Sequence, residues 1–168
     1  MCSSDLASWA TPLKVSVNVS PIQLMNTSLT DTIIEVLHQT GLDPRRLDLE
    51  ITESDVFNEN TRSLEILSQL REQGIQISID DFGTGYSSLS RLSYFPFDKI
   101  KIDRSFVINI PEQKDDLDIV RLIISMGKSL HMRIVAEGVE TEEQLASLQA
   151  LGCDLVQGYL IGKPSPLR

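Results

Sequence analysis

Two adjacent carboxylates followed by a glycine-rich turn are the strongest chemical signal in this sequence. Residues 75–88 read IQISIDDFGTGYSS, and isoleucines alternate with polar residues as far as Asp80. This period of two predicts a strand with one apolar and one polar face. Gly83 and Gly85 allow the backbone to turn sharply directly after Asp80 and Asp81. Carboxylates at a strand end before a glycine loop predict a metal site.

Composition narrows the classes of protein to which the chain can belong. Its 168 residues are 41% apolar, which is enough for one folded domain with a hydrophobic core. The net charge of -9 argues against binding to a nucleic-acid polymer or a membrane surface, because both attract clustered Lys and Arg. An anionic substrate would therefore need metal ions to offset the charge. The sequence has no signal-peptide pattern, and we expect a cytoplasmic protein.

The first six residues, MCSSDL, differ from the rest of the chain. They contain no helix cap, no periodicity and no apolar stripe that leads into the next segment. One interpretation is that residues 1–6 are not native sequence. The remaining residues show no linker, so we expect residues 1–168 to form one partial domain.

Hydrophobic periodicity predicts alternating strands and helices along the chain. The predicted strands are Lys14–Ser20, Leu47–Thr52, the strand from Ile75, Lys99–Asp103, Arg133–Glu137 and Asp154–Tyr159. The predicted helices are Ser28–Thr40, Asn60–Gln73, Tyr86–Leu92, Asp115–Leu130 and one that a Thr141 capping box opens. In Asp115–Leu130, the residues expected on one apolar face are Ile119, Leu122, Ile123, Met126 and Leu130. Strand-then-helix units are typical of parallel sheets.

Polar residues near the strand ends favour a closed barrel over an open sheet. Strands of an open doubly wound sheet are usually apolar on both faces, whereas these keep one polar face. A barrel gathers the ends of all its strands at one mouth, where barrel enzymes place their chemistry. The strand-end residues are Asn18, Glu50, Asp80, Lys101, Glu137 and Gln157. We therefore predict an α/β fold of the TIM-like (β/α) barrel type.

About six strands are fewer than the eight of a complete (β/α)8 barrel, which typically has about 250 residues. We interpret the deficit as truncation of the barrel at its N-terminus and also at its C-terminus. Carboxylate and amide oxygens suit Mg2+ or Mn2+ better than zinc or copper. A carboxylate shared by two such ions is the arrangement of two-metal phosphodiester hydrolysis.

Six ordered motifs make the sequence resemble the EAL-domain phosphodiesterases, which hydrolyse bacterial cyclic di-GMP to linear pGpG. The motifs are NVSP at 18–21, LDLEITES at 47–54, DDFGTGYSS at 80–88, KIKIDRSFV at 99–107, VAEGVET at 135–141 and CDLVQGYL at 153–160. Together they span essentially the whole chain after the first dozen residues. The resemblance implies cyclic di-GMP as substrate and two ions of Mg2+ or Mn2+.

The resemblance also implies a role for each matching residue. The implied metal ligands are Asn18, Glu50, Asp80, Asp81 and Glu137, with Asp80 shared by both ions. The implied catalytic residues are Lys101, Glu137 and Gln157. Glu53, Thr84 and Gly85 are implied to support the glycine loop, and Asp103 and Glu140 to orient Lys101 or that loop.

One part of the family pattern is missing from the chain. In the family, the glutamate of the Glu-x-Leu motif lies upstream of the segment that matches at Asn18. Residues 1–18 of this chain contain no glutamate. We therefore expect the complete gene product to be an active phosphodiesterase and this fragment to be impaired. The resemblance further implies a homodimer when the domain is complete, and upstream sensory or GGDEF domains.

Three alternative functions remain to be weighed. A degenerate EAL domain would bind cyclic di-GMP without cleaving it, but such a receptor need not keep Asp80, Asp81, Lys101 and Glu137 together. An unrelated magnesium-dependent barrel enzyme is disfavoured by the ordered motifs. The DFG triplet at 81–83 is also found in protein kinases, yet no catalytic-loop motif accompanies it.

Overall fold

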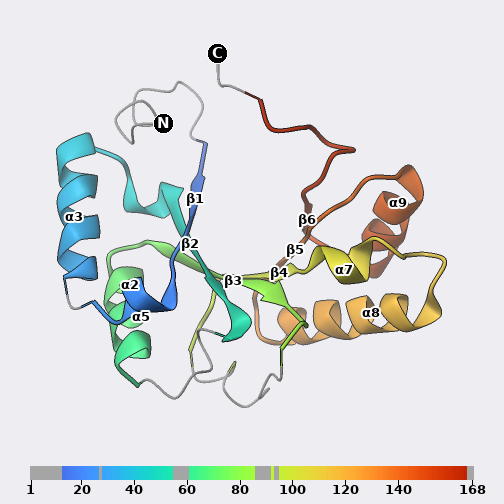
Figure 1. The fold of residues 1–168 in the computed structure, drawn as a ribbon, viewed down its shortest axis with the longest axis horizontal. Coiled ribbons are helices and arrows are strands. Elements are labelled where there is room, and N and C mark those ends of the chain that lie inside the picture. Colours follow the sequence, from blue (N-terminus) through green and yellow to red (C-terminus); the bar gives the residue numbers. More distant parts are fainter. Residues whose placement is uncertain (1–12, 27, 55–60, 86–91, 93–94, 166–168) are drawn as a thin grey trace. The chain divides into compact units, whose positions relative to one another are not determined.

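Strands alternate with helices along the chain, as the sequence predicts (Figure 1). The computed structural model of the protein describes residues 13–26, 28–54, 61–85, 92 and 95–165. The chain divides into a first unit, residues 1–78 and 87–97, and a second unit, residues 79–86 and 98–168. Residues 1–6 and the predicted helix at 86–92, apart from Leu92, lie outside the described residues.

The first unit is built on parallel strands with helical connections. Its strands are β1 (Val15–Asn18), β2 (Leu47–Thr52) and the beginning of β3 (Gln76–Phe82). Its helices are α2 (Pro21–Leu24), α3 (Leu29–Thr40), the 3-10 helix η1 (Pro44–Arg46) and α5 (Thr61–Glu72). β1 and β2 pair in parallel, and the register places Asn18 opposite Glu50.

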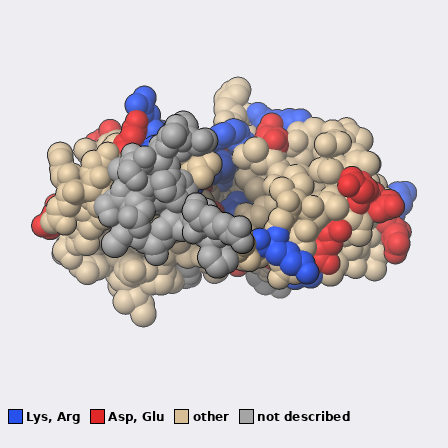
Figure 2. Space-filling view, turned by 90° about the horizontal axis from the view of Figure 1, so that it is seen from above, with Lys and Arg blue, Asp and Glu red and all other residues tan. Residues whose placement is uncertain are grey.

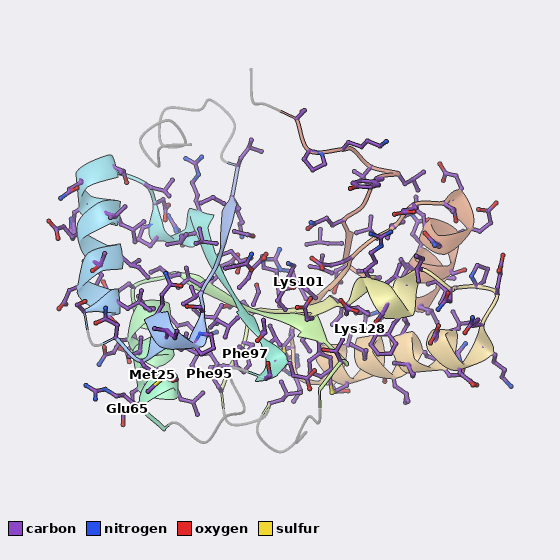
Figure 3. All side chains as sticks on the ribbon, in the orientation of Figure 1. Met25, Glu65, Phe95, Phe97, Lys101 and Lys128 are labelled. Atoms are coloured by element: carbon purple, nitrogen blue, oxygen red, sulfur yellow. The ribbon has the colours of Figure 1, made fainter. Side chains whose placement is uncertain are left out.

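The polar face predicted for these strands is present and partly buried. Asp48 on β2 is completely buried, and its carboxylate accepts hydrogen bonds from the hydroxyls of Ser78 at 2.6 Å and Ser16 at 3.3 Å. Buried charge is costly unless it is hydrogen-bonded, and the two hydroxyls supply such bonds. The apolar side chains of β2 are buried too, and the rings of Phe95 and Phe97 add to this core with centroids 4.5 Å apart (Figure 3).

The second unit repeats the parallel pattern. Its strands are the end of β3, β4 (Lys99–Ile102), β5 (Arg133–Ala136) and β6 (Leu155–Val156), in that order across the sheet. Its helices are α7 (Arg104–Val107), α8 (Lys114–Ser129) and α9 (Glu142–Leu151). Parallel strands that neighbour each other in sequence order have the connectivity of a (β/α) barrel. The predicted α/β class is therefore confirmed.

Local sequence signals fix several helix ends as predicted. The Thr141 hydroxyl accepts a hydrogen bond from the backbone N–H of Gln144. The side-chain oxygen of Gln144 accepts one from the backbone N–H of Thr141. The predicted capping box is therefore confirmed. Gly41 and Gly152 end their helices with left-handed φ angles of 68° and 79°. Glycine adopts this conformation without the steric cost of a Cβ atom.

Three predicted details were wrong. The last strand covers only Leu155–Val156, and β3 continues through both aspartates to Phe82 instead of ending at them. Leu122 is 69% exposed, although it was expected on the apolar face of its helix. The buried residues of α8 are instead Val120, Ile123, Ile124 and Gly127. The reason is a close approach at Gly127, because a Cβ atom there would clash with Ile134 of β5.

On the face shown in Figure 2, the Lys and Arg side chains that the structure describes lie in separate small groups. None of the described helices is long and apolar enough to cross a bilayer.

Replacing Gly158 with alanine should destabilise the second unit. A Cβ atom at Gly158 would clash with the backbone N and O of Val139, and the backbone there cannot move without breaking hydrogen bonds to Gln157 and Leu160. We expect Gly158→Ala to lower the free energy of unfolding by about 1–3 kcal/mol in thermal or urea unfolding. Gly162→Ala is the matched control, since no atom lies within 4 Å of its added Cβ. Equal stability of both variants would contradict the close approach.

Candidate metal centre

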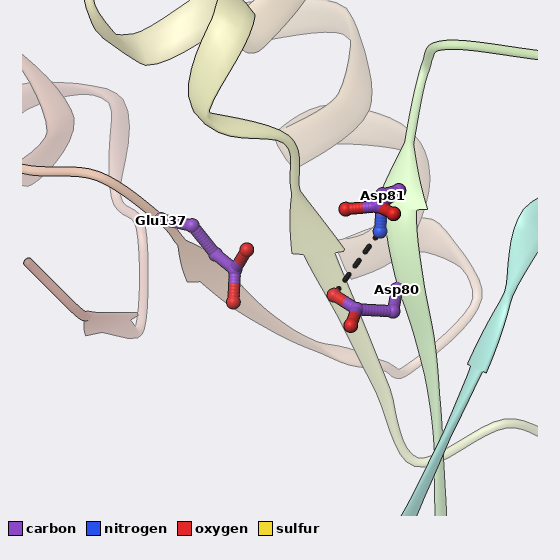
Figure 4. Close-up of side chains that lie close together, drawn as sticks. All are labelled: Asp80, Asp81 and Glu137. Atoms are coloured by element: carbon purple, nitrogen blue, oxygen red, sulfur yellow. Dashed lines mark hydrogen bonds between the residues drawn. The ribbon is translucent and has the colours of Figure 1, made fainter. Parts of the chain in front are cut away.

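Three carboxylates converge in the second unit. Asp80 and Asp81 belong to β3, and Glu137 directly follows β5. One oxygen atom from each side chain lies within 4.8 Å of the others (Figure 4). The structure thus brings together three of the five predicted metal ligands.

An unusual backbone conformation lets neighbouring aspartates reach one cluster. Successive side chains of a regular strand point to opposite faces. Asp81 has a φ of 52°, a left-handed value that aspartate tolerates better than most residues. Its backbone N–H donates to Oδ1 of Asp80 at 3.1 Å, shown as the dashed line in Figure 4. The irregular backbone at Asp81 breaks the alternation and allows both carboxylates to serve one site.

Lys101 supplies the positive charge at this cluster. Its Nζ lies 3.0 Å from Oδ1 of Asp80 and 2.7 Å from Oε1 of Glu137. The lysine is 6% exposed, near the middle of the view in Figure 3. Ion pairs so shielded from water are screened much less than those on the surface. Lys101 therefore lies directly beside two of the three carboxylates.

The pKa of the Asp81 carboxyl reflects both its burial and the negative charges near it. Burial raises the pKa of the Asp81 carboxyl above its ordinary value, and the charges of Asp80 and Asp103 raise it further. Lys101 opposes this rise without cancelling it. The part of this rise that comes from Asp80 and Asp103 reflects negative charge, which also attracts cations.

The donor set fits a hard divalent cation. All three converging side chains offer carboxylate oxygens, which Mg2+ and Mn2+ prefer to nitrogen or sulfur ligands. Neither cysteine nor histidine belongs to the group. The chemistry of these residues therefore agrees with the predicted cofactor class.

The other predicted site residues are found in both units. Asn18 and Glu50 are register partners in the first unit, where Glu53 is also found, 2% exposed. In the second unit, the hydroxyl of Thr84 donates to the carbonyl of Asp81 at 2.9 Å, and Gly85 follows in the same turn.

Three further predicted residues lie at the ends of β4, β5 and β6. Gln157 directly follows β6 and is exposed. Asp103 directly follows β4, and its carboxylate caps α7 by accepting from the backbone N–H of Ser105 at 2.9 Å. Glu140 forms an ion pair with Arg104.

Sequence reasoning missed Arg104 and Phe106. Both lie in the motif KIKIDRSFV, from which only the first lysines and Asp103 received attention. Phe106 fills the space beside Gly83, where a Cβ atom would lie 2.7 Å from Cε2 of the ring. The sequence signal for Arg104 is its position directly after Asp103, the last residue of a predicted strand.

Comparison with known proteins agrees with the geometry. The family model described as "EAL domain" matches residues 1–164. The chain belongs to the EAL domain family. Cyclic di-GMP phosphodiesterase NbdA of Pseudomonas aeruginosa is 46% identical over 155 residues, which cover 92% of this chain and 20% of NbdA. This EAL chain thus spans about a fifth of the length of that relative.

Solved structures support the same fold for this EAL chain. It matches a structure of the PaMucR phosphodiesterase in complex with c-di-GMP, with a TM-score of 0.92 and 42% identity over 98% of this chain and 68% of that one. It also matches Klebsiella pneumoniae BlrP1 in a manganese and cyclic di-GMP complex, with a TM-score of 0.81 and 34% identity over 88% and 38% of the two chains. The expected TIM-like fold of an EAL domain is confirmed.

Removing the charge of Asp81 should change how stability depends on pH. Because its pKa is raised on folding, the ionised carboxyl disfavours the folded state. That cost is absent below the ordinary value of 3.8 and is complete above the raised pKa. In EDTA, Asp81→Asn should therefore gain stability relative to the parent as pH rises from about 4 to about 7 in thermal unfolding.

Glu143→Gln is a control of opposite sign for this pH experiment. The backbone N–H of Glu143 and the Thr141 hydroxyl lower the pKa of the Glu143 carboxyl. Its ionised form therefore favours the folded state above the ordinary value of 4.5, and the stabilisation is lost as pH falls. The variant should lose stability relative to the parent as pH rises. Parallel pH curves for Asp81→Asn and the parent would contradict the charge crowding.

Replacing Lys101 with methionine should destabilise the metal-free protein. The substitution leaves Asp80 and Glu137 without their shared counter-ion, and removal of one partner from a buried ion pair costs about 3–5 kcal/mol. Urea unfolding in EDTA measures the loss. Arg121→Met is the control, because Arg121 and Asp118 pair with side chains 55% and 45% exposed. Such surface pairs contribute about 0–1 kcal/mol, and a similar loss in both variants would refute a special role of Lys101.

Proposed function

We propose that this chain is part of a metal-dependent phosphodiesterase domain that hydrolyses cyclic di-GMP to linear pGpG. The convergence of Asp80, Asp81 and Glu137 around the Lys101 ammonium group supports the proposal most directly. Relatives named cyclic di-GMP phosphodiesterases and a similar structure titled as a c-di-GMP complex support the substrate.

The carboxylates would hold the divalent cation. When bound, Mg2+ or Mn2+ would lower the pKa of a water molecule and offset charge on the phosphodiester. On the family resemblance, Asp80 would be the ligand shared by two ions. The net charge of -9 makes such cations necessary for a substrate that is itself anionic.

Lys101 has a distinct proposed role. Its ammonium group donates to Asp80 and Glu137, so both carboxylates are oriented toward one point. The same positive charge would orient the attacking water and stabilise negative charge that develops on the phosphate. Burial of Lys101 strengthens this interaction because little water screens it.

The other site residues are proposed on the family resemblance. Asn18 and Glu50 would complete the ligands of the first ion, and Gln157 would line the site. Glu53, Thr84 and Gly85 would support the glycine loop, for which the Thr84 hydrogen bond to Asp81 gives local support. Asp103 and Glu140 would act as supporting residues.

The proposal extends to a longer protein, since the matched region covers only 20% of NbdA. We propose sensory or GGDEF domains upstream, a homodimer and a cytoplasmic location. A relative named as a bifunctional diguanylate cyclase and cyclic di-GMP phosphodiesterase, of which the matched region covers 22%, supports the first of these. Residues 1–168 alone are proposed to be impaired, because residues 1–18 contain no glutamate to serve as the missing ligand.

Assays of the gene's whole product test the function. It should convert cyclic di-GMP to pGpG with Mg2+ or Mn2+, and chromatography should show little product in EDTA. Asp80→Asn should lower the rate by at least about 100-fold, because it removes the shared ligand. Asp118→Asn, on an exposed part of α8, is the charge-matched control. Residues 1–168 alone should be slower than the whole product.

Two outcomes would separate the alternatives. Binding of cyclic di-GMP by the whole product in EDTA, without hydrolysis when Mn2+ is added, would establish the receptor function instead. Hydrolysis by residues 1–168 at the rate of the whole product would contradict the proposed impairment.

A further inference from the structure

The turn at 137–140, which carries Glu137, is held by backbone hydrogen bonds at Glu137, Val139 and Glu140. The backbone N–H of Glu137 donates to the carbonyl of Ile102 at 3.2 Å, and that of Val139 donates to the carbonyl of Gln157 at 3.1 Å. Gly138 adopts a left-handed φ of 71°. The position of the Glu137 carboxylate therefore depends on what holds this turn in place.

The side chain of Arg104 covers the turn. A Cβ atom added to Gly138 would overlap Cγ of Arg104 and would lie 2.8 Å from its Cδ. The stem of Arg104 thus occupies the space that the missing side chain of Gly138 leaves. At the far end of the stem, Nη2 donates to Oε1 of Glu140 at 2.8 Å. One side chain therefore spans the turn from the residue after Glu137 to Glu140.

The residues on either side of Arg104 contact the part of the chain that carries Asp81. Arg104 is the first residue of α7, and the backbone N–H of Asp103, which caps this helix, donates to the carbonyl of Phe82, the residue after Asp81, at 3.5 Å. Two residues later, Phe106 packs against Gly83 in the turn that follows Asp81. The segment 103–106 consequently touches both carboxylate-bearing parts of the centre.

A second contact holds the same elements together. The buried side chain of Gln144 donates to the carbonyl of Ile108 at 3.1 Å and accepts from the backbone N–H of Glu140 at 2.7 Å. These two hydrogen bonds of Gln144 keep α7 and the start of α9 in place independently of Arg104. Loss of the Arg104 contact should therefore loosen the turn without unfolding the unit.

We propose that Arg104 is a positioning residue of the metal centre, which holds the turn at 137–140 so that Glu137 can bind a cation together with Asp80 and Asp81. The Arg104 and Glu140 side chains are 53% and 35% exposed, so their ion pair contributes about 0–1 kcal/mol to stability. Its effect should appear in cation affinity, because loss of residues that orient metal ligands typically weakens binding about 10-fold to 100-fold.

Mn2+ binding to the gene's whole product tests this inference, which rests on the proposed function. The electron paramagnetic resonance signal of free Mn2+ gives the Kd without any assay of activity. Arg104→Gln and Glu140→Gln should each raise the Kd about tenfold, and the double variant should be no worse than either single one. Arg104→Glu combined with Glu140→Arg should recover part of the affinity. Circular dichroism verifies that each variant folds. If Arg104→Gln does not fold, Glu140→Gln tests the same contact from its other partner.

Arg121→Gln is the matched control, since Arg121 forms an ion pair of similar exposure within α8. Its Kd for Mn2+ should equal that of the parent. A change of less than about twofold for folded Arg104→Gln or Glu140→Gln would overturn the inference while the metal site stands. A parent protein that does not bind Mn2+, or that binds it no better than Asp80→Asn, would overturn the proposed function and this inference with it.

Discussion

Repulsion between like charges is the constraint on which the centre depends. Three carboxylates within 4.8 Å cannot all stay ionised at low cost unless positive charge compensates them. The buried ammonium of Lys101 compensates Asp80 and Glu137 directly. Burial raises the pKa of Asp81, and the charges of Asp80 and Asp103 raise it further while Lys101 lowers it only in part. The imbalance is the physical reason that the site suits a divalent cation.

The fold holds these charges in place by using strands for some residues and turns for others. Lys101 lies inside β4, where its backbone is fixed and its side chain is buried. Glu137 follows the end of β5 and depends on the turn after it, and Asp81 depends on a left-handed residue within β3. Lys101 therefore depends on strand pairing for its position, whereas Asp81 and Glu137 depend on local backbone conformation.

Much of this arrangement could be predicted from sequence because its causes are local. β2 matches its predicted bounds, and the Thr141 capping box forms as expected, because alternation and capping involve residues close in sequence. The exposure of Leu122 could not be predicted, because it depends on the contact between Gly127 and Ile134. Periodicity shows that a helix has an apolar side but not which residues a neighbouring strand will cover.

The sequence by itself determined the kinds of groups at the centre: oxygen ligands, one lysine, and the motifs that identify an EAL domain. Only the tertiary structure decided that Asp80, Asp81 and Glu137 meet and that Lys101 lies between two of them. It also decided that Glu140 pairs with Arg104. The physical reason is that residue types and spacing define what each group can do, whereas strand register and the conformations of turns define which groups touch.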